Sequence, residues 1–123
     1  MKFIAPLLVI FSLTAAFAHD MDHEHDGWYK TLMMPDYPQS PCCGYADAYW
    51  CDSINVRDGA TYCTITDDQD DVPLGRPHVP IGTEIIIPNH KLKWDRGNPT
   101  GHAIVFLSPK EHNVYCFVQS TGI

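Results

Sequence analysis

Five cysteines are the residues of this sequence with the most distinctive chemistry: Cys42, Cys43, Cys51, Cys63 and Cys116. A cysteine can pair in a disulfide or, as a thiolate, act as a nucleophile. In an oxidising compartment, five cysteines are expected to give two disulfides and one unpaired thiol. We predict that Cys42, Cys43, Cys51 and Cys116 are bridged, with one member of the adjacent pair joined to Cys51 and the other to Cys116. Cys63 is then the spare, because the strand pattern around it predicts burial among aliphatic side chains.

The stretch around the first three cysteines has a second interpretation, in which it begins a helix. Ser40 suits an N-cap and Pro41 suits the first helical position. Cys43 would then lie in the first turn, where the helix dipole and free N–H groups favour a thiolate. A helix continuing to Trp50 would separate Cys43 from Cys51 by roughly 12 Å, whereas a disulfide tolerates about 7 Å between Cα atoms. The segment is therefore either a bridged clamp or a helix with a reactive thiol.

The helical interpretation is accompanied by a family resemblance. Cys-Gly-Tyr at 43–45, Val-Pro-Ile-Gly-Thr from residue 79 and Gly-His-Ala from residue 101 resemble the cell-wall cysteine peptidases of the NlpC/P60 type. That resemblance implies Cys43 as the nucleophile, His102 as the base, and His112 or Asn113 as the group that orients the base. A thiolate and an imidazole held by a third group form a general acyl-transfer arrangement.

A second group of residues with coordination chemistry lies at 19–26, where histidines alternate with carboxylates. Imidazole nitrogen is a suitable ligand for Zn, Cu and Ni. His19, His23 and His25 are therefore candidate ligands for loosely bound Zn or Cu. The alternative is a solvated, flexible arm whose metal affinity is incidental, since the segment has almost nothing to bury.

The acidic run at 67–71 is the most strongly charged stretch of the chain. Counted from its first aspartate, it has neither the Gly at position six nor the Glu at position twelve of an EF-hand loop. We interpret it as a solvated turn.

Short strands are the elements that must position these residues. Asp58-Gly59 lies between two runs of β-forming residues and predicts a hairpin in which Ile54 faces Cys63 and Val56 faces Thr61. Three later segments, at 84–87, 103–107 and 114–118, are apolar on both faces, which is typical of strands covered on both sides. The predicted fold is β-rich α+β: a small twisted sheet or partly open barrel of short antiparallel strands, with one or two short N-terminal helices and disulfide staples.

The N-terminus predicts export. Lys2 precedes an apolar run that ends at Phe11, and small residues follow as far as Ala18, which is the pattern of a secretory signal peptide. The apolar run is shorter than the about 20 residues that span a bilayer. We predict a signal peptide at 1–18, a His/Asp-rich flexible arm at 19–26 and a single small domain at 27–123, located in the periplasm or outside the cell, with no membrane span in the mature chain.

Composition narrows the choice of partner. The formal net charge is −7, with 8 basic residues, which argues against nucleic acid because phosphate contacts come from Lys and Arg. An adjacent early Cys pair and a Tyr-Cys-Phe at 115–117 are similar to small secreted bacterial proteins of unknown function, and this resemblance implies an exported, disulfide-bearing domain. We predict a binding or interaction module for an unknown protein or envelope component. The alternatives are a cell-wall cysteine peptidase or amidase and a periplasmic metal-binding protein.

Overall fold

The computed structural model describes residues 20, 21 and 23–120. The predicted signal peptide and His19 lie outside the described residues. In chain order the elements are η1 (His23–His25), α1 (Asp26–Tyr29), β1 (Asp47–Trp50), β2 (Ser53–Arg57), β3 (Ala60–Thr64), α2 (Asp71–Leu74), β4 (Glu84–Ile87), η2 (Asn89–Lys91), β5 (Leu92–Lys93), β6 (Ile104–Leu107) and β7 (Val114–Val118).

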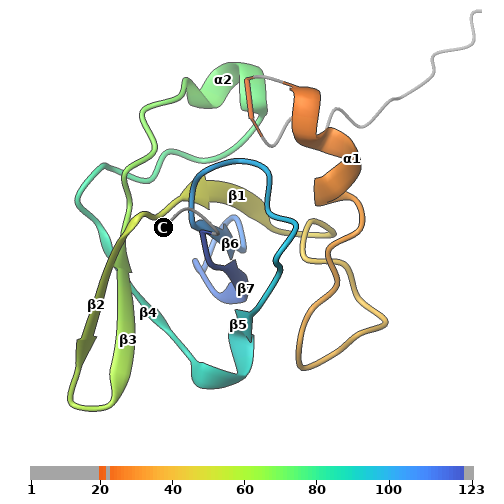
Figure 1. Ribbon diagram of the computed structural model, residues 1–123. Coiled ribbons are helices and arrows are strands. Elements are labelled where there is room, and N and C mark those ends of the chain that lie inside the picture. The colour runs from red at the N-terminus through yellow and green to blue at the C-terminus, as the bar shows by residue number, and fades with distance from the viewer. Residues whose placement is uncertain (1–19, 22, 121–123) are drawn as a thin grey trace, which may run out of the picture.

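The strands form two small open sheets. One sheet has the order β1-β6-β7-β5 and the other β2-β3-β4. All pairs are antiparallel except β5 with β7. Figure 1 shows the β2–β3 hairpin at the left, β6 and β7 at the centre, and α1 at the upper right. The β-rich α+β prediction is confirmed.

The β2–β3 hairpin has the register that its turn predicts, with Ile54 opposite Cys63 and Val56 opposite Thr61. Both turn residues have positive φ, 51° at Asp58 and 78° at Gly59, which is the backbone of a type I′ turn. Cys63 is buried, but Ile54 and Val56 are 47% and 65% exposed. The apolar side of the hairpin is therefore covered at β3 and open at β2.

The core has two parts, one on each face of the β1-β6-β7-β5 sheet. One part lies between the sheets and includes Ile65, Val105 and Phe117; the other lies beneath the N-terminal segment and includes Tyr29 and Phe106. All four residues of β6 are buried, because neighbouring side chains point to opposite faces and both faces are covered. The sequence prediction of a doubly covered strand at this position is confirmed.

Of the two interpretations of the segment after Ser40, the helical one is wrong. Residues 42–45 form turns and bends, and strand β1 follows at Asp47. The Cys42 N–H donates to the Leu32 carbonyl oxygen at 2.9 Å, and Pro41 forms an isolated bridge with Met33. These contacts tie the segment to the preceding chain, so its backbone groups are satisfied without a helix.

Among the described residues, none of the helices has the length and apolar character needed to cross a membrane.

Candidate functional site

The disulfides differ from the predicted pairing. Cys42 is bridged to Cys116 and Cys51 to Cys63, with Cα–Cα distances of 5.7 and 5.5 Å. The unpaired cysteine is Cys43, not Cys63. The burial predicted for Cys63 is correct, but burial does not distinguish a spare thiol from a bridged one. Two disulfides are consistent with an extracytoplasmic location.

Cys43 is held in a setting that suppresses thiolate chemistry. Its side chain is buried, and the Sγ–H donates to the Tyr29 carbonyl oxygen at 3.5 Å. Burial raises the pKa of the Cys43 thiol to about 12. Because the predicted helix is absent, no helix N-terminus opposes this shift. The nucleophile that the peptidase resemblance implies is a neutral thiol at neutral pH.

His102 is paired with an acidic residue, Asp52, and not with His112 or Asn113, which the resemblance implied. Its Nδ1 lies 2.7 Å from Asp52 Oδ2, and its ring stacks on Trp50 with centroids 3.9 Å apart. His112 and Asn113 lie in the exposed loop between β6 and β7. Within the described part of the chain, His102 forms no hydrogen bond with Cys43, whose Sγ–H donates to Tyr29 instead. The structure therefore brings together an Asp–His pair that lacks the implied nucleophile.

The N-terminal histidines are only partly within the described residues. His23 and His25 form η1, and His23 Nδ1 lies 3.0 Å from Asp26 Oδ2. In residues 20, 21 and 23–120, no group of three His, Cys, Asp or Glu side chains is arranged to hold a metal ion. His19 lies outside this part of the chain, so loose Zn or Cu binding stays a prediction.

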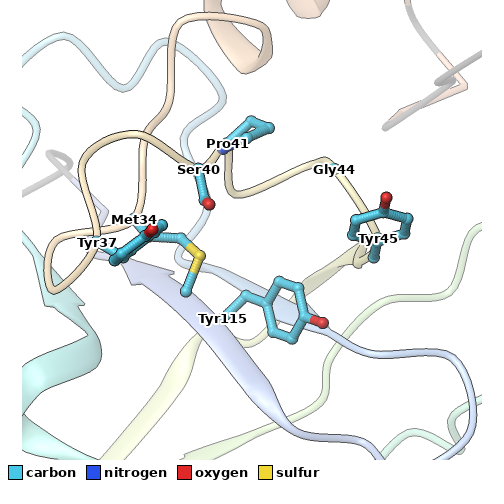
Figure 2. A pocket seen from close by; sticks show the side chains of 7 residues that line it. All are labelled: Met34, Tyr37, Ser40, Pro41, Gly44, Tyr45 and Tyr115. Atoms are coloured by element: carbon cyan, nitrogen blue, oxygen red, sulfur yellow. The ribbon is translucent and has the colours of Figure 1, made fainter.

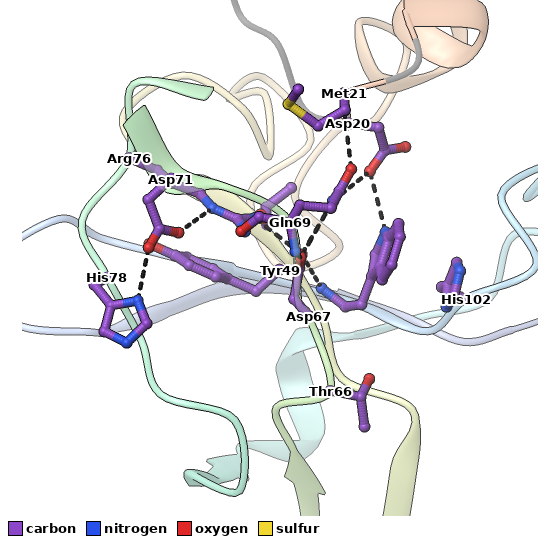
Figure 3. Close-up of polar contacts among 12 residues, drawn as sticks. Asp20, Met21, Tyr49, Thr66, Asp67, Gln69, Asp71, Arg76, His78 and His102 are labelled. Carbon is purple, nitrogen blue, oxygen red and sulfur yellow. Dashed lines mark hydrogen bonds and ion pairs between the residues drawn. The ribbon is translucent and has the colours of Figure 1, made fainter. Parts of the chain in front are cut away.

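Asp20 corrects the expectation that the segment at 19–26 has nothing to bury. Its carboxylate is buried and accepts hydrogen bonds from Tyr29 Oη at 2.9 Å, Trp50 Nε1 at 3.1 Å and Gln69 Nε2 at 3.5 Å. Figure 3 shows Asp20 and Gln69 facing each other across this cluster. Burial first, and then the Asp20 charge, raise the pKa of Tyr29. Asp20 therefore anchors the N-terminal segment to β1.

The acidic run also differs from a solvated turn, because its first residue forms a buried ion pair. Asp67 Oδ2 lies 2.9 Å from Arg76 Nη1, and these side chains are 1% and 3% exposed. Arg76 also donates to Asp71 Oδ1 and to the Ala48 carbonyl oxygen, each at 2.8 Å, and lies over the Tyr49 ring. The guanidinium thus links three parts of the chain (Figure 3).

A hollow of about 660 Å³ is lined by the sequence neighbours of the bridged Cys42 and Cys116, and it is the best candidate for a ligand site. Its lining is Met34, Tyr37, Ser40, Pro41, Gly44, Tyr45 and Tyr115. Figure 2 shows Tyr45 across the hollow from Met34 and Tyr37. Tyr37 and Tyr45 are 57% and 82% exposed. Sequence reasoning missed these tyrosines, although Tyr115 adjoins Cys116 and Tyr45 lies close to Cys42 in the sequence.

A second hollow, of about 560 Å³, lies on the other side of Tyr45. It shares Gly44 and Tyr45 with the first hollow, and its charged lining residues are Asp47, Asp71 and Arg76, of which the last two are ion-paired. Burial raises the pKa of Asp47, and the charge of Arg76 opposes that effect only in part. A neutral aromatic hollow and a charged hollow, in which Asp47 is the carboxylate that Arg76 does not pair, therefore meet at one exposed tyrosine.

The fold and these contacts define a small β-rich domain stabilised by two disulfides. No family model, curated protein or solved structure matches the chain.

Proposed function

We propose that the protein is an exported binding module that recognises an extended, proline-containing peptide segment with a Lys or Arg next to the proline. The observation that supports this proposal is the hollow of about 660 Å³ between Met34 and Tyr45, which we call the tyrosine hollow. Three tyrosines, a methionine and a proline surround it, and none of its seven lining residues is charged.

The lining suits a ring that is neutral and largely apolar. Tyrosine rings provide rigid, flat contact area, and methionine adapts to an irregular ligand surface. Grooves lined by aromatic side chains are the usual docking sites for polyproline II segments, whose extended backbone is ordered before binding. In the described part of the chain, the hydroxyls of Tyr37, Tyr45 and Tyr115 form no hydrogen bond, so they can donate to peptide carbonyls.

A peptide fits the lining better than a glycan. Sugars present adjacent hydroxyls, for which paired acceptors such as carboxylate or amide groups are needed, and the polar side chains of this hollow are single hydroxyls. Asp47, in the second hollow beyond Tyr45, adds a place for a cation, because the other carboxylate there, Asp71, is already paired with Arg76. A Lys or Arg of the ligand would favour the ionised form of Asp47, whose pKa burial raises.

A disulfide joins the two segments that carry Pro41 and Tyr115, and such a cross-link lowers the entropy that binding must overcome. Cys42, next to Pro41, is bridged to Cys116, next to Tyr115. At Gly44 a Cβ atom would lie 3.1 Å from Pro41 Cγ, so a side chain there would press against the wall of the hollow. The disulfide thus holds the two walls at a fixed separation.

A titration followed by ¹H–¹⁵N correlation spectra tests the proposal. The probe is a synthetic decapeptide of alternating Pro and Ala with a central Lys, and its reference is the same peptide with Gly in place of each Pro. We expect the Pro peptide to shift amide signals of residues 34–45 and of Tyr115. Tyr45→Ala should weaken this binding at least about fivefold, since an aromatic contact contributes about 1 kcal/mol. Trp94→Ala removes an equally exposed aromatic outside the hollow and should leave binding unchanged.

Two results would overturn the proposal. Equal shifts with the Gly peptide would show that no ring is recognised. Shifts at the hollow with a soluble chitin hexasaccharide, and none with the Pro peptide, would assign the site to a glycan instead.

A further inference from the structure

Strand β2 is an edge strand with exposed apolar side chains. Among the described residues its sole strand partner is β3, and all five of its residues are exposed. Ile54 and Val56 lie on the face that turns toward the second sheet, where they line a cavity of about 320 Å³ with Leu92 and Phe117. Unpaired edges with apolar side chains are templates for another strand.

The turn determines which backbone groups of β2 are unpaired. In a two-residue hairpin the residues that flank the turn form a hydrogen-bonded pair, here Arg57 with Ala60. The pattern alternates along the ladder, so Ser53, Asn55 and Arg57 bond to β3. The N–H and C=O groups of Ile54 and Val56 therefore point away from the sheet.

We infer that β2 pairs antiparallel with β2 of a second copy of this chain, about a two-fold axis at Asn55. Ile54 of each copy then lies opposite Val56 of the other, and these two residues exchange both backbone hydrogen bonds. The two alternative two-fold registers are worse. Centring on Ile54 places Val56 opposite Asp52, and centring on Val56 places Ile54 opposite Asp58.

The two faces of β2 support the same pairing. On the outer face Arg57 is paired with Glu84 and lies 4.1 Å from the Tyr62 ring centroid, and in this register it faces Ser53 of the second copy. On the inner face four exposed aliphatic side chains, two from each copy, meet beside the cavity. Two three-stranded sheets become one continuous sheet, and the exposed edge disappears.

The register also predicts how charge affects the dimer. Asp52 of each copy lies opposite Asp58 of the other at the ends of the paired strands, and each chain carries a net charge of −7. Like charges opposite one another on a sheet are destabilising. Association should therefore strengthen as salt is raised from about 50 to about 500 mM, because the Debye length becomes shorter than the separation of these charges.

Sedimentation velocity over a range of protein concentrations tests the inference. Val56→Pro removes only an outward N–H, which β3 does not use, and proline is tolerated on edge strands. The dimer should weaken about thirtyfold, because two backbone hydrogen bonds per dimer are lost. Val56→Thr keeps the N–H and β propensity and should still dimerise. Far-UV circular dichroism checks that each variant folds.

Asp58→Asn provides a test in the opposite direction. Asn-Gly is as well suited to the type I′ turn as Asp-Gly, so the hairpin is retained. The dimer should be several-fold tighter than wild type at about 50 mM salt, and the difference should shrink at about 500 mM. A protein that stays monomeric at every concentration, or a dimer that Val56→Pro leaves unchanged, would overturn the inference.

Discussion

Replacing Asp67 by Asn tests whether the buried ion pair holds the fold. Asp67 Oδ2 accepts from Arg76 Nη1 at 2.9 Å and from the Trp50 N–H at 3.0 Å, while Oδ1 accepts from the Gln69 N–H at 2.9 Å. An amide has only one oxygen, so its NH₂ group must face a donor wherever it points. The substitution also leaves the buried Arg76 charge with one of its two acidic partners, Asp71.

The expected cost is about 3 kcal/mol of unfolding free energy. Removing one partner of a buried ion pair typically costs about 3–5 kcal/mol, because the other charge stays buried. The lower end applies because Arg76 keeps three acceptors, which are Asp71 Oδ1 and the carbonyl oxygens of Ala48 and Gln69. That loss is a large part of the about 5–15 kcal/mol that stabilises a typical domain.

Urea unfolding followed by far-UV circular dichroism at neutral pH measures this cost. Asp68→Asn is the matched control, because Asp68 is the exposed neighbour and its substitution changes the net charge equally. The control should stay within about 0.5 kcal/mol of wild type. If Asp67→Asn and Asp68→Asn unfold at the same urea concentration, the argument from burial fails.

The same pair predicts a response to acid. Burial alone would raise the pKa of Asp67, but hydrogen bonds from Arg76 and from the Trp50 and Gln69 amides outweigh it and lower the pKa. A lowered folded-state pKa gives stability that is fully present above the unfolded value, near 4, and is lost as the pH falls through the folded value. The stability difference between wild type and Asp67→Asn should therefore be constant at neutral pH and shrink below about pH 4. A difference that does not change with pH would contradict this assignment.

Three further outcomes follow from the cysteines. Replacing Cys42 and Cys116 by Ser opens a loop of 74 residues and should cost about 4 kcal/mol in the chain-entropy estimate. Replacing Cys51 and Cys63 opens a loop of 12 residues and should cost about 3 kcal/mol by the same estimate, so urea titration should rank the two variants in that order. Cys43 should resist iodoacetamide in the native protein and react in denaturant, as intact mass will show; rapid native labelling would contradict its burial.

Local chemistry made the strands predictable. The hairpin register followed from Asp58-Gly59, because a two-residue turn determines which residues of its strands face one another. The doubly buried β6 followed from apolar residues on both of its faces. In each case the signal lies within a few residues, so no knowledge of the rest of the fold was needed.

Disulfide connectivity was not predictable for a geometric reason. A cysteine among aliphatic residues can be a spare thiol or one half of a bridge, and Cys63 is bridged to Cys51. The choice between Cys42 and Cys43 depends on which side chain points at β7 as the chain turns before β1. The sequence of the turn does not determine that direction, and the helix signal at Ser40 pointed to a different backbone.

The sequence analysis missed the buried hydrogen bonds of Asp20 and the buried ion pair of Asp67, because the partners in each are distant in sequence. Asp20 and Gln69 are 49 residues apart, and each lies in a segment whose composition indicates a solvated turn or arm. Charge density predicts exposure when no partner is known, but a buried Arg76 reverses that expectation for Asp67. The sequence contains one indication of this ion pair, an arginine that follows an acidic run. That pattern is too common to predict burial.

The residues that stabilise the fold differ from those that line the proposed peptide-binding site. The two roles can therefore be tested separately. The carboxylates of Asp20 and Asp67 hold buried donors in place, so their loss should destabilise the domain. Tyr37 and Tyr45 are mostly exposed and contribute little buried area. Exposed side chains outside such networks change stability by about 0.5 kcal/mol or less. A loss of peptide binding in Tyr45→Ala with unchanged urea unfolding therefore reports on recognition, whereas a loss of both would place Tyr45 in the fold.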